Sequence, residues 1–159
     1  EGRHSGNGFT YAFEEGFLKK YFIFGLHENF VSKSVFNTLK TIEERVKYVT
    51  YEEIAVRKTK SFTTEINQAI KFISNTPFGV ELDLDALPNI HSSAMTLSGF
   101  SVEKARHFIH LAGREELASY LHICEGAPDL DVSNNNHLTG KLIATLILDF
   151  IKSKKTEEY

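Results

Sequence analysis

The chain has 159 residues, the length of one domain, and its 42% hydrophobic content with 13 Phe is ample for a packed core. A net charge of −3 and a pI near 6.2 argue against a nucleic-acid partner and against binding to a membrane surface. The one cysteine, Cys124, leaves no disulfide framework and favours a reducing, cytoplasmic setting.

Runs of apolar residues with strand and helix periodicity alternate along the chain. Such alternation is typical of an α/β fold, a mainly parallel sheet covered by helices on both faces in three α/β/α layers. The longest apolar run, 142–151, contains Asp149 and is too short to span a bilayer, so no membrane partner is expected. In chain order we expect a helix over 9–20, a strand over 21–26, a helix over 34–46, a strand over 46–51, a helix over 63–74, a strand over 78–84, a helix over 101–112, a strand over 118–124, and a last helix from about 137 to 155.

Polar side chains follow each predicted strand. In open parallel sheets the ligand site lies at the carboxyl ends of the strands, so these side chains are candidate site residues. They are grouped at residues 27–29, 51–53, 83–85 and 125. This expectation rests on the residue pattern alone.

Asp83 and Asp85 flank Leu84 at the end of the third predicted strand. Side chains alternate along a strand, so the two carboxylates are expected to share one face while Leu82 and Leu84 point into the core. Two adjacent carboxylates repel each other, and a divalent cation that prefers oxygen ligands would relieve that repulsion. The alternative is an acidic turn exposed to solvent, because Asp-x-Asp is a common tripeptide.

Four segments together resemble the carboxyl-terminal part of the ureohydrolase family, which includes arginase, agmatinase and formimidoylglutamase. Those enzymes are dinuclear manganese hydrolases that attack guanidinium or amidinium carbons. The resemblance implies an arginase-like fold, two Mn²⁺ in the complete domain, and Asp83 and Asp85 as metal ligands. The segments are RHSGNGF at 3–9, GLHEN at 25–29, LDLDALP with the loop SSAMTLSGFS within 82–101, and YLHICEGAPDLD at 120–131.

Glu125 matches the family's glutamate that pairs with the cationic nitrogens of the substrate. A carboxylate suits a planar cationic group with two nitrogens, because it accepts two parallel hydrogen bonds. The resemblance thus implies a catalytic and substrate-binding role for Glu125, whereas the residue pattern alone allows a strand-end glutamate in solvent. We expect Cys124 and His122 to lie in the core, and Glu81 to need a partner or water.

The amino-terminal segment resembles the loop that follows the family's central metal motif. Ser5 and Asn7 match substrate-contacting positions, and Arg3 could pair with a substrate carboxylate. The arginase proton-shuttling histidine is replaced by Phe9, a substitution that fits the formimidoylglutamase branch, and His4 is the alternative proton carrier. The competing interpretation is a loop without a role in the site.

Asn29 is the other substrate-binding candidate. It follows the first strand where arginases carry Gly-x-Arg-Asp-x-Asp, and the aspartate that arginases use for the α-amino group is replaced by Phe30. This departure also favours the formimidoylglutamase branch, in which an asparagine precedes a helix.

The resemblance covers nearly the whole chain, so residues 1–159 are expected to be the carboxyl-terminal portion of a single arginase-like catalytic domain. The family strand that carries the central metal motif would lie between two strands present here, so a sheet built from this chain alone should have a gap, and the chain alone should be inactive.

The implied substrate is a small amidine or guanidine, foremost N-formimidoyl-L-glutamate in histidine breakdown. Another guanidino substrate, or a non-catalytic relative acting through assembly, remains open. Family members commonly form homo-oligomers.

Overall fold

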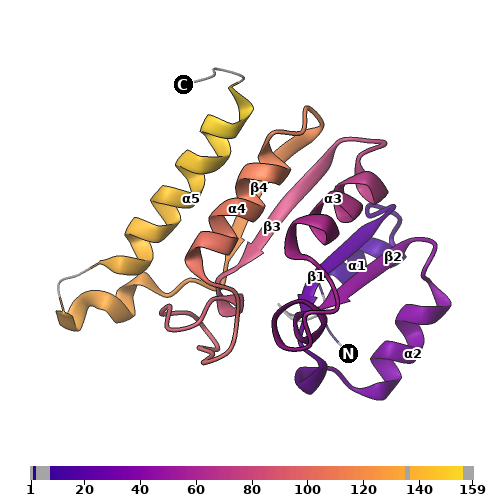
Figure 1. Ribbon diagram of the computed structural model, residues 1–159, viewed down its shortest axis with the longest axis horizontal. Coiled ribbons are helices and arrows are strands. Elements are labelled where there is room, and N and C mark those ends of the chain that lie inside the picture. Colours follow the sequence, from indigo (N-terminus) through magenta and orange to yellow (C-terminus); the bar gives the residue numbers. More distant parts are fainter. Residues whose placement is uncertain (1, 3–7, 135–136, 156–159) are drawn as a thin grey trace.

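The structure is a computed structural model that describes Gly2, residues 8–134 and residues 137–155. Strands and helices alternate as the apolar pattern predicted (Figure 1). The strands are β1 (Tyr21–Leu26), β2 (Val46–Thr50), β3 (Phe78–Asp83) and β4 (Ala118–Cys124). The helices are α1 (Gly8–Glu14), α2 (Lys33–Thr41), α3 (Phe62–Ile73), α4 (Val102–Gly113) and α5 (Leu138–Lys154), with short helical turns at η2 (Glu28–Phe30), η3 (Glu52–Val56), η4 (Leu84–Ala86) and η5 (Pro128–Asn134).

The four strands form two parallel pairs, β1–β2 and β3–β4. Among the described residues, no ladder of hydrogen bonds joins one pair to the other, as expected for a sheet that has a gap. Figure 1 shows the pairs side by side, with α4 and α5 lying over β3 and β4. The α/β fold with parallel strands is therefore confirmed, and the sheet is divided into two halves.

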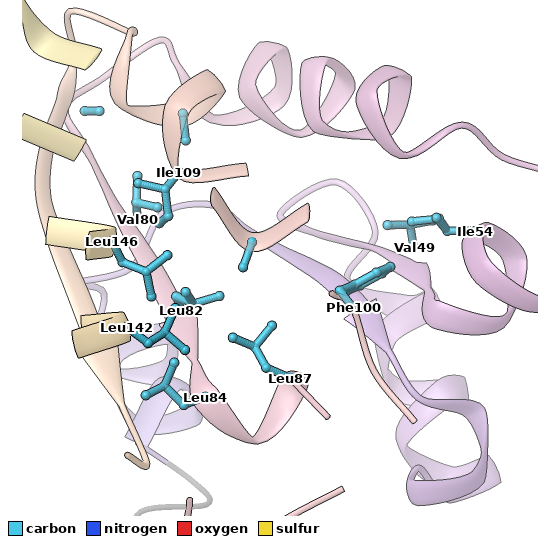
Figure 2. Packing of buried hydrophobic residues seen from close by; sticks show 13 residues of the cluster. Val49, Ile54, Val80, Leu82, Leu84, Leu87, Phe100, Ile109, Leu142 and Leu146 are labelled. Carbon is cyan, nitrogen blue, oxygen red and sulfur yellow. The ribbon is translucent and has the colours of Figure 1, made fainter. Parts of the chain in front are cut away.

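The main core lies between the β3–β4 pair and helices α4 and α5. Residues that alternate along β3 point into it, and Leu84 of η4 continues the same row with no exposed surface. Figure 2 shows these side chains meeting the apolar residues of α4 and α5. The core residues from these elements are Val80, Leu82, Leu84, Ala105, Ile109, Ala112, Ala118, Leu142 and Leu146.

The opposite face of the β3–β4 pair is polar. It carries the partly or largely exposed side chains of Glu81, His122 and Tyr120. The Tyr120 ring lies directly over Gly79 on the neighbouring strand, where a Cβ would overlap the ring. In the described residues, the apolar cover of this pair is thus confined to one face.

Helices cover both faces of the β1–β2 pair. Aromatic contacts define the packing because both strands are rich in Phe and Tyr. On one face α3 meets β1 through Phe22–Phe72 and Phe24–Phe62, and on the other α1 and α2 meet the strands through Phe9–Tyr21 and Phe36–Tyr48. The three-layer arrangement is complete here.

An aromatic cluster joins the two halves of the sheet. The ring of Phe24 on β1 lies 5.8 Å from Phe100, which precedes α4, and 5.9 Å from Phe108 on α4. Phe62 at the start of α3 contacts Phe24 and Phe100 at 5.2 Å each. The halves are therefore held together by side-chain packing.

Two helices end several residues earlier than the sequence predicted, and one short element was not predicted. The first helix ends at Glu14 rather than near residue 20, because Gly16 adopts φ +82°, which breaks the helical path. The second helix ends at Thr41 instead of residue 46. A π-helical turn, η3, for which the sequence analysis made no prediction, follows β2, and such turns often occur beside functional sites. None of the described helices is both long and apolar enough to cross a bilayer.

Gly25 interrupts the pairing of β1 with β2 and adopts φ +81°. A Cβ at this position would lie 2.5 Å from a ring carbon of Phe100. We expect Gly25→Ala to lower the free energy of unfolding by about 1–3 kcal/mol, because it combines an unfavourable backbone conformation with a clash. Urea denaturation of the chain measures this loss.

Gly16→Ala is the matched control. Its φ is +82°, and a Cβ there meets no atom within 4 Å. It should therefore show the backbone cost without the clash. Equal losses in the two variants would mean that the Phe100 ring moves aside without cost.

Candidate active site

Asp83 and Asp85 lie at the carboxyl end of β3, in a geometry that differs from the expected one. β3 ends at Asp83. Oδ1 of Asp83 accepts a hydrogen bond from the N–H of Asp85 at 2.8 Å, and this hydrogen bond caps the start of the η4 turn. The expectation that both carboxylates share one face of a strand is wrong, because Asp85 already belongs to the turn. Leu82 and Leu84 are buried as predicted.

The Asp85 carboxylate is oriented by the loop that follows η4. Its Oδ2 accepts a hydrogen bond from the Ser93 hydroxyl at 3.0 Å, and its Oδ1 accepts one from the N–H of Ala94 at 2.9 Å. Each oxygen keeps a free lone pair, so the carboxylate is oriented while still able to bind a metal. Sequence reasoning did not identify Ser93, although its place in the small-residue loop pointed to it.

The same loop is tied to the end of β4, which brings Glu125 to it. The N–H of Ser93 donates to the carbonyl of Glu125 at 2.9 Å, and the N–H of Ala127 donates to the carbonyl of His91 at 2.9 Å. Glu125 is partly buried and has φ +61°, a conformation that costs a non-glycine residue about 1–3 kcal/mol. Strain of this kind occurs often at functional sites, and the structure shows it also at Lys58, Asn89 and His137.

Negative charge accumulates at this strand end. Although Asp83 as a residue is exposed, partial burial of its carboxyl group raises the pKa, and the charges of Asp85, Glu125 and Glu81 raise it further. The hydrogen bond from the N–H of Asp85 opposes this increase without cancelling it. A bound cation would stabilise the charged form of Asp83.

A buried carboxylate, that of Asp131, connects the loop to the start of α5. Asp131 is 5% exposed, and its carboxylate accepts a hydrogen bond from the N–H of Thr139 at 2.6 Å at the start of α5. Its other oxygen lies 3.4 Å from His91 Nε2. The neighbouring Ser92 hydroxyl is buried, and within the described part of the chain it has no hydrogen-bond partner. An unpaired buried hydroxyl beside the loop is a position where water or a ligand can bind.

A second polar group lies at the carboxyl ends of β1 and β2. The Glu28 carboxylate forms two hydrogen bonds with Arg57, at 2.5 and 2.9 Å, and one with the Thr50 hydroxyl at 2.9 Å. The hydrogen bond with Arg57 is the main cause that lowers the pKa of Glu28 to about 2. Asn29, predicted to bind substrate, is exposed in the adjoining η2 turn. The structure thus places Asn29 at the expected sheet edge, and its contact with substrate stays a prediction.

The remaining predicted residues lie at the amino terminus. Arg3, His4, Ser5 and Asn7 fall outside the described residues, so their roles stay predictions. Phe9 belongs to α1 and stacks on Tyr21 with ring centroids 4.7 Å apart.

Glu81, His122 and Cys124 form a cluster that the sequence analysis assigned differently. His122 was expected in the core, but its side chain is 58% exposed, and Nδ1 lies 3.3 Å from Glu81 Oε2. Cys124 is partly exposed on the same face instead of lying in the core. The assignment failed because the row of alternate residues that contains them points away from α4 and α5.

The electrostatics of this face are strongly negative. Burial is the largest cause that raises the pKa of the Cys124 thiol to about 12, followed by the charges of Asp83, Glu81 and Glu125. Burial, together with the charges of Glu81, Cys124 and Asp83, also raises the pKa of Tyr21 on β1. In the described residues, Glu81, His122 and Cys124 can each place one metal-ligand atom within 4.8 Å of the other two. The ligand atoms of Asp83, Asp85 and Glu125 are farther apart.

No protein-family model matches the chain, and no curated protein sequence is similar to it. Solved structures do match. Formimidoylglutamase from Bacillus subtilis subsp. subtilis str. 168 superposes with a TM-score of 0.82 at 18% identity, over 100% of this chain and 51% of that chain. A Trypanosoma cruzi formiminoglutamase variant with Mn²⁺ gives 0.80 at 16% identity, over 98% and 50%. Arginase from Bacillus subtilis gives 0.70 at 19% identity, over 88% and 50%.

These matches define the fold in two steps. The parallel strands with polar residues at their carboxyl ends place the chain among α/β proteins whose site lies at that edge. Within that class the chain has the arginase fold, and it spans about half the length of the structures that it matches. This coverage of about half is what a partial domain of that fold would give, and the assignment to the carboxyl-terminal portion of a ureohydrolase domain stays a prediction.

The raised pKa of Asp83 predicts a cost in stability. A carboxyl group whose pKa is higher in the folded chain than its ordinary value of 3.8 destabilises the fold at neutral pH, and the penalty disappears as pH falls below 3.8. Asp83→Asn keeps a side chain that can accept the hydrogen bond from Asp85. We therefore expect it to be more stable than the wild type at pH 7 with a chelator present, and equally stable near pH 3.

Asp129→Asn, which changes an exposed acid in η5, is the control. Thermal unfolding of the three proteins at both pH values measures the difference. A lower unfolding temperature for Asp83→Asn than for the wild type at pH 7 would contradict the interpretation of charge repulsion.

Proposed function

We propose that this chain contributes to a manganese-dependent hydrolase site that cleaves a C–N bond of an amidine or guanidine. The preferred substrate is N-formimidoyl-L-glutamate, which with one water gives L-glutamate and formamide. The observation that carries the proposal is a set of hydrogen bonds at the strand ends of an arginase fold. The Asp83 carboxylate accepts a hydrogen bond from the N–H of Asp85, and the loop that binds the Asp85 carboxylate also binds the carbonyl of Glu125. Manganese is present in the similar Trypanosoma cruzi formiminoglutamase structure.

Asp83 and Asp85 supply the type of ligand atom that manganese prefers, but too few of them for two ions. Carboxylate oxygens suit Mn²⁺, and Asp85 is already oriented by Ser93 and Ala94. A pair of octahedral ions needs more donors than Asp83 and Asp85 supply, so further ligands would have to come from outside this pair. When bound, such ions lower the pKa of water so that hydroxide is available at neutral pH.

Glu125 would hold the substrate. Its carboxylate can accept hydrogen bonds from two nitrogens of an amidinium, which turns the reacting carbon toward the metal-binding carboxylates. The hydrogen bond between its carbonyl and Ser93 would hold the backbone from which the Glu125 side chain projects. His4 stays the proposed proton carrier.

The dianionic glutamate part of the substrate needs cationic partners. Arg57 is already neutralised by Glu28, which makes it a weaker choice. A cavity of about 390 Å³ at the carboxyl end of β2 is lined by Lys58 and Lys104 together with Tyr51 and Phe100, and the described residues of its lining include no acid. These lysines, with Arg3, Ser5, Asn7 and Asn29, are the proposed contacts for that end of the substrate. Homo-oligomeric assembly and a cytoplasmic setting stay predictions.

The test uses the complete gene product, supplied with Mn²⁺ and a panel of formimidoylglutamate, arginine, agmatine and guanidinobutyrate. We expect formamide only from formimidoylglutamate. Urea from a guanidino substrate would keep the chemistry and change the substrate. No turnover by a folded protein with bound manganese would favour a non-catalytic relative.

Glu125→Gln tests the role of the glutamate. The amide keeps the size of the side chain but removes the negative charge that faces the amidinium, so kcat should fall by at least about a hundredfold. Manganese content, measured by metal analysis, should stay unchanged. Glu116→Gln, at an exposed position preceding β4, is the control and should keep full activity. Near-normal turnover in Glu125→Gln would remove Glu125 from the mechanism.

A further inference from the structure

Glu81, His122 and Cys124 occupy adjacent positions on the polar face of the β3–β4 pair. Glu81 is aligned with His122 across the two strands, and Asp83 is aligned with Cys124. Residues two apart on one strand point to the same side, so all four side chains rise from one face. The positions of Glu81, His122 and Cys124 are set by strand pairing and not by a loop.

The ligand atoms are near one another, at separations somewhat wider than those around a tetrahedral metal. With Zn–N, Zn–O and Zn–S bonds of about 2.0–2.3 Å, neighbouring ligands in a tetrahedron lie about 3.3–3.8 Å apart. Here His122 Nδ1 lies 3.3 Å from one Glu81 oxygen, Oε2, and Cys124 Sγ lies 3.8 Å from the other, Oε1. All three ligand atoms fall within 4.8 Å of one another. Side-chain rotations that shorten these separations to about 3.3–3.8 Å would place the three atoms around one ion.

The chemistry of the three donors selects the kind of cation. A thiolate and an imidazole beside one carboxylate suit Zn²⁺ or Co²⁺, whereas Mn²⁺ prefers oxygen donors. The His122 side chain is 58% exposed and that of Glu81 is 30% exposed, so an ion can reach them and a water can fill the fourth position. The acids around Cys124 create a negative potential that favours a cation.

We propose that Glu81, His122 and Cys124 form a mononuclear site for Zn²⁺ or a similar borderline divalent cation, distinct from the carboxylates of Asp83 and Asp85. On binding, the Cys124 thiol releases its proton to solvent, and the thiolate bonds to the metal. The ion joins β3 to β4 and stabilises the pair. Glu81 lies one strand repeat from Asp83, about 6.6 Å along β3, so the site adjoins the proposed manganese site without sharing its ligands.

The test measures metal binding by the full chain. Titration with Zn²⁺ in competition with a chromogenic chelator should give one site per chain, and Zn²⁺ should raise the midpoint of thermal unfolding. Co²⁺ should give a thiolate-to-cobalt charge-transfer band. Cys124→Ser should abolish the band, and both Cys124→Ser and His122→Asn should weaken Zn²⁺ binding at least about tenfold.

Two control variants separate this site from other metal binding. His110→Asn removes an exposed histidine on α4 and should leave Zn²⁺ affinity unchanged. Asp85→Asn should also keep the site, because Asp85 belongs to the proposed manganese set. Circular dichroism establishes that each variant is folded.

Three results would overturn the proposal. The first is no Zn²⁺ binding by the folded wild type, and the second is a cobalt band that survives in Cys124→Ser. The third is a loss of affinity in His110→Asn as large as that in His122→Asn. The manganese hydrolase proposal fails independently, since it depends on turnover by the complete gene product and not on Zn²⁺.

Discussion

The hydrogen bond from the N–H of Asp85 to the Asp83 carboxylate determines how the candidate active site is built. It ends β3 and starts a turn that buries Leu84 completely, and this fixes the direction in which Asp85 leaves the strand. Asp85 then holds the following loop through Ser93 and Ala94, and that loop holds Glu125. Three acids thus depend on one turn and on the core that anchors it.

The division of the sheet explains why the two faces of the chain differ so much. The β1–β2 pair has helices on both sides, whereas the β3–β4 pair packs on α4 and α5 with one face and presents acids, a histidine and a thiol on the other. The aromatic contacts of Phe24 with Phe62, Phe100 and Phe108 connect the halves. At the end of β3, the charges of Asp85 and Glu125 and that of Glu81 on the open face therefore act together on Asp83.

Much of the fold could be predicted from the sequence, because its strands are short apolar runs and its helices carry regular apolar stripes. β1 and β4 have the predicted bounds. The strand pattern placed Asp83 correctly but not Asp85, since a side chain that bonds its own backbone two residues on overrides strand alternation. His122 and Cys124 were assigned to the core because alternation identifies which residues share a face, not which face is covered.

The absence of a backbone ladder between the two described strand pairs has a consequence for folding. Each pair closes through its own crossover, α2 for β1–β2 and α4 for β3–β4, so each can form without waiting for the other. Contacts within each half are closer along the chain than the rings that join the halves, and local closure comes at a lower entropic cost. The halves should therefore open and close as two cooperative units, with their aromatic junction the last part to order.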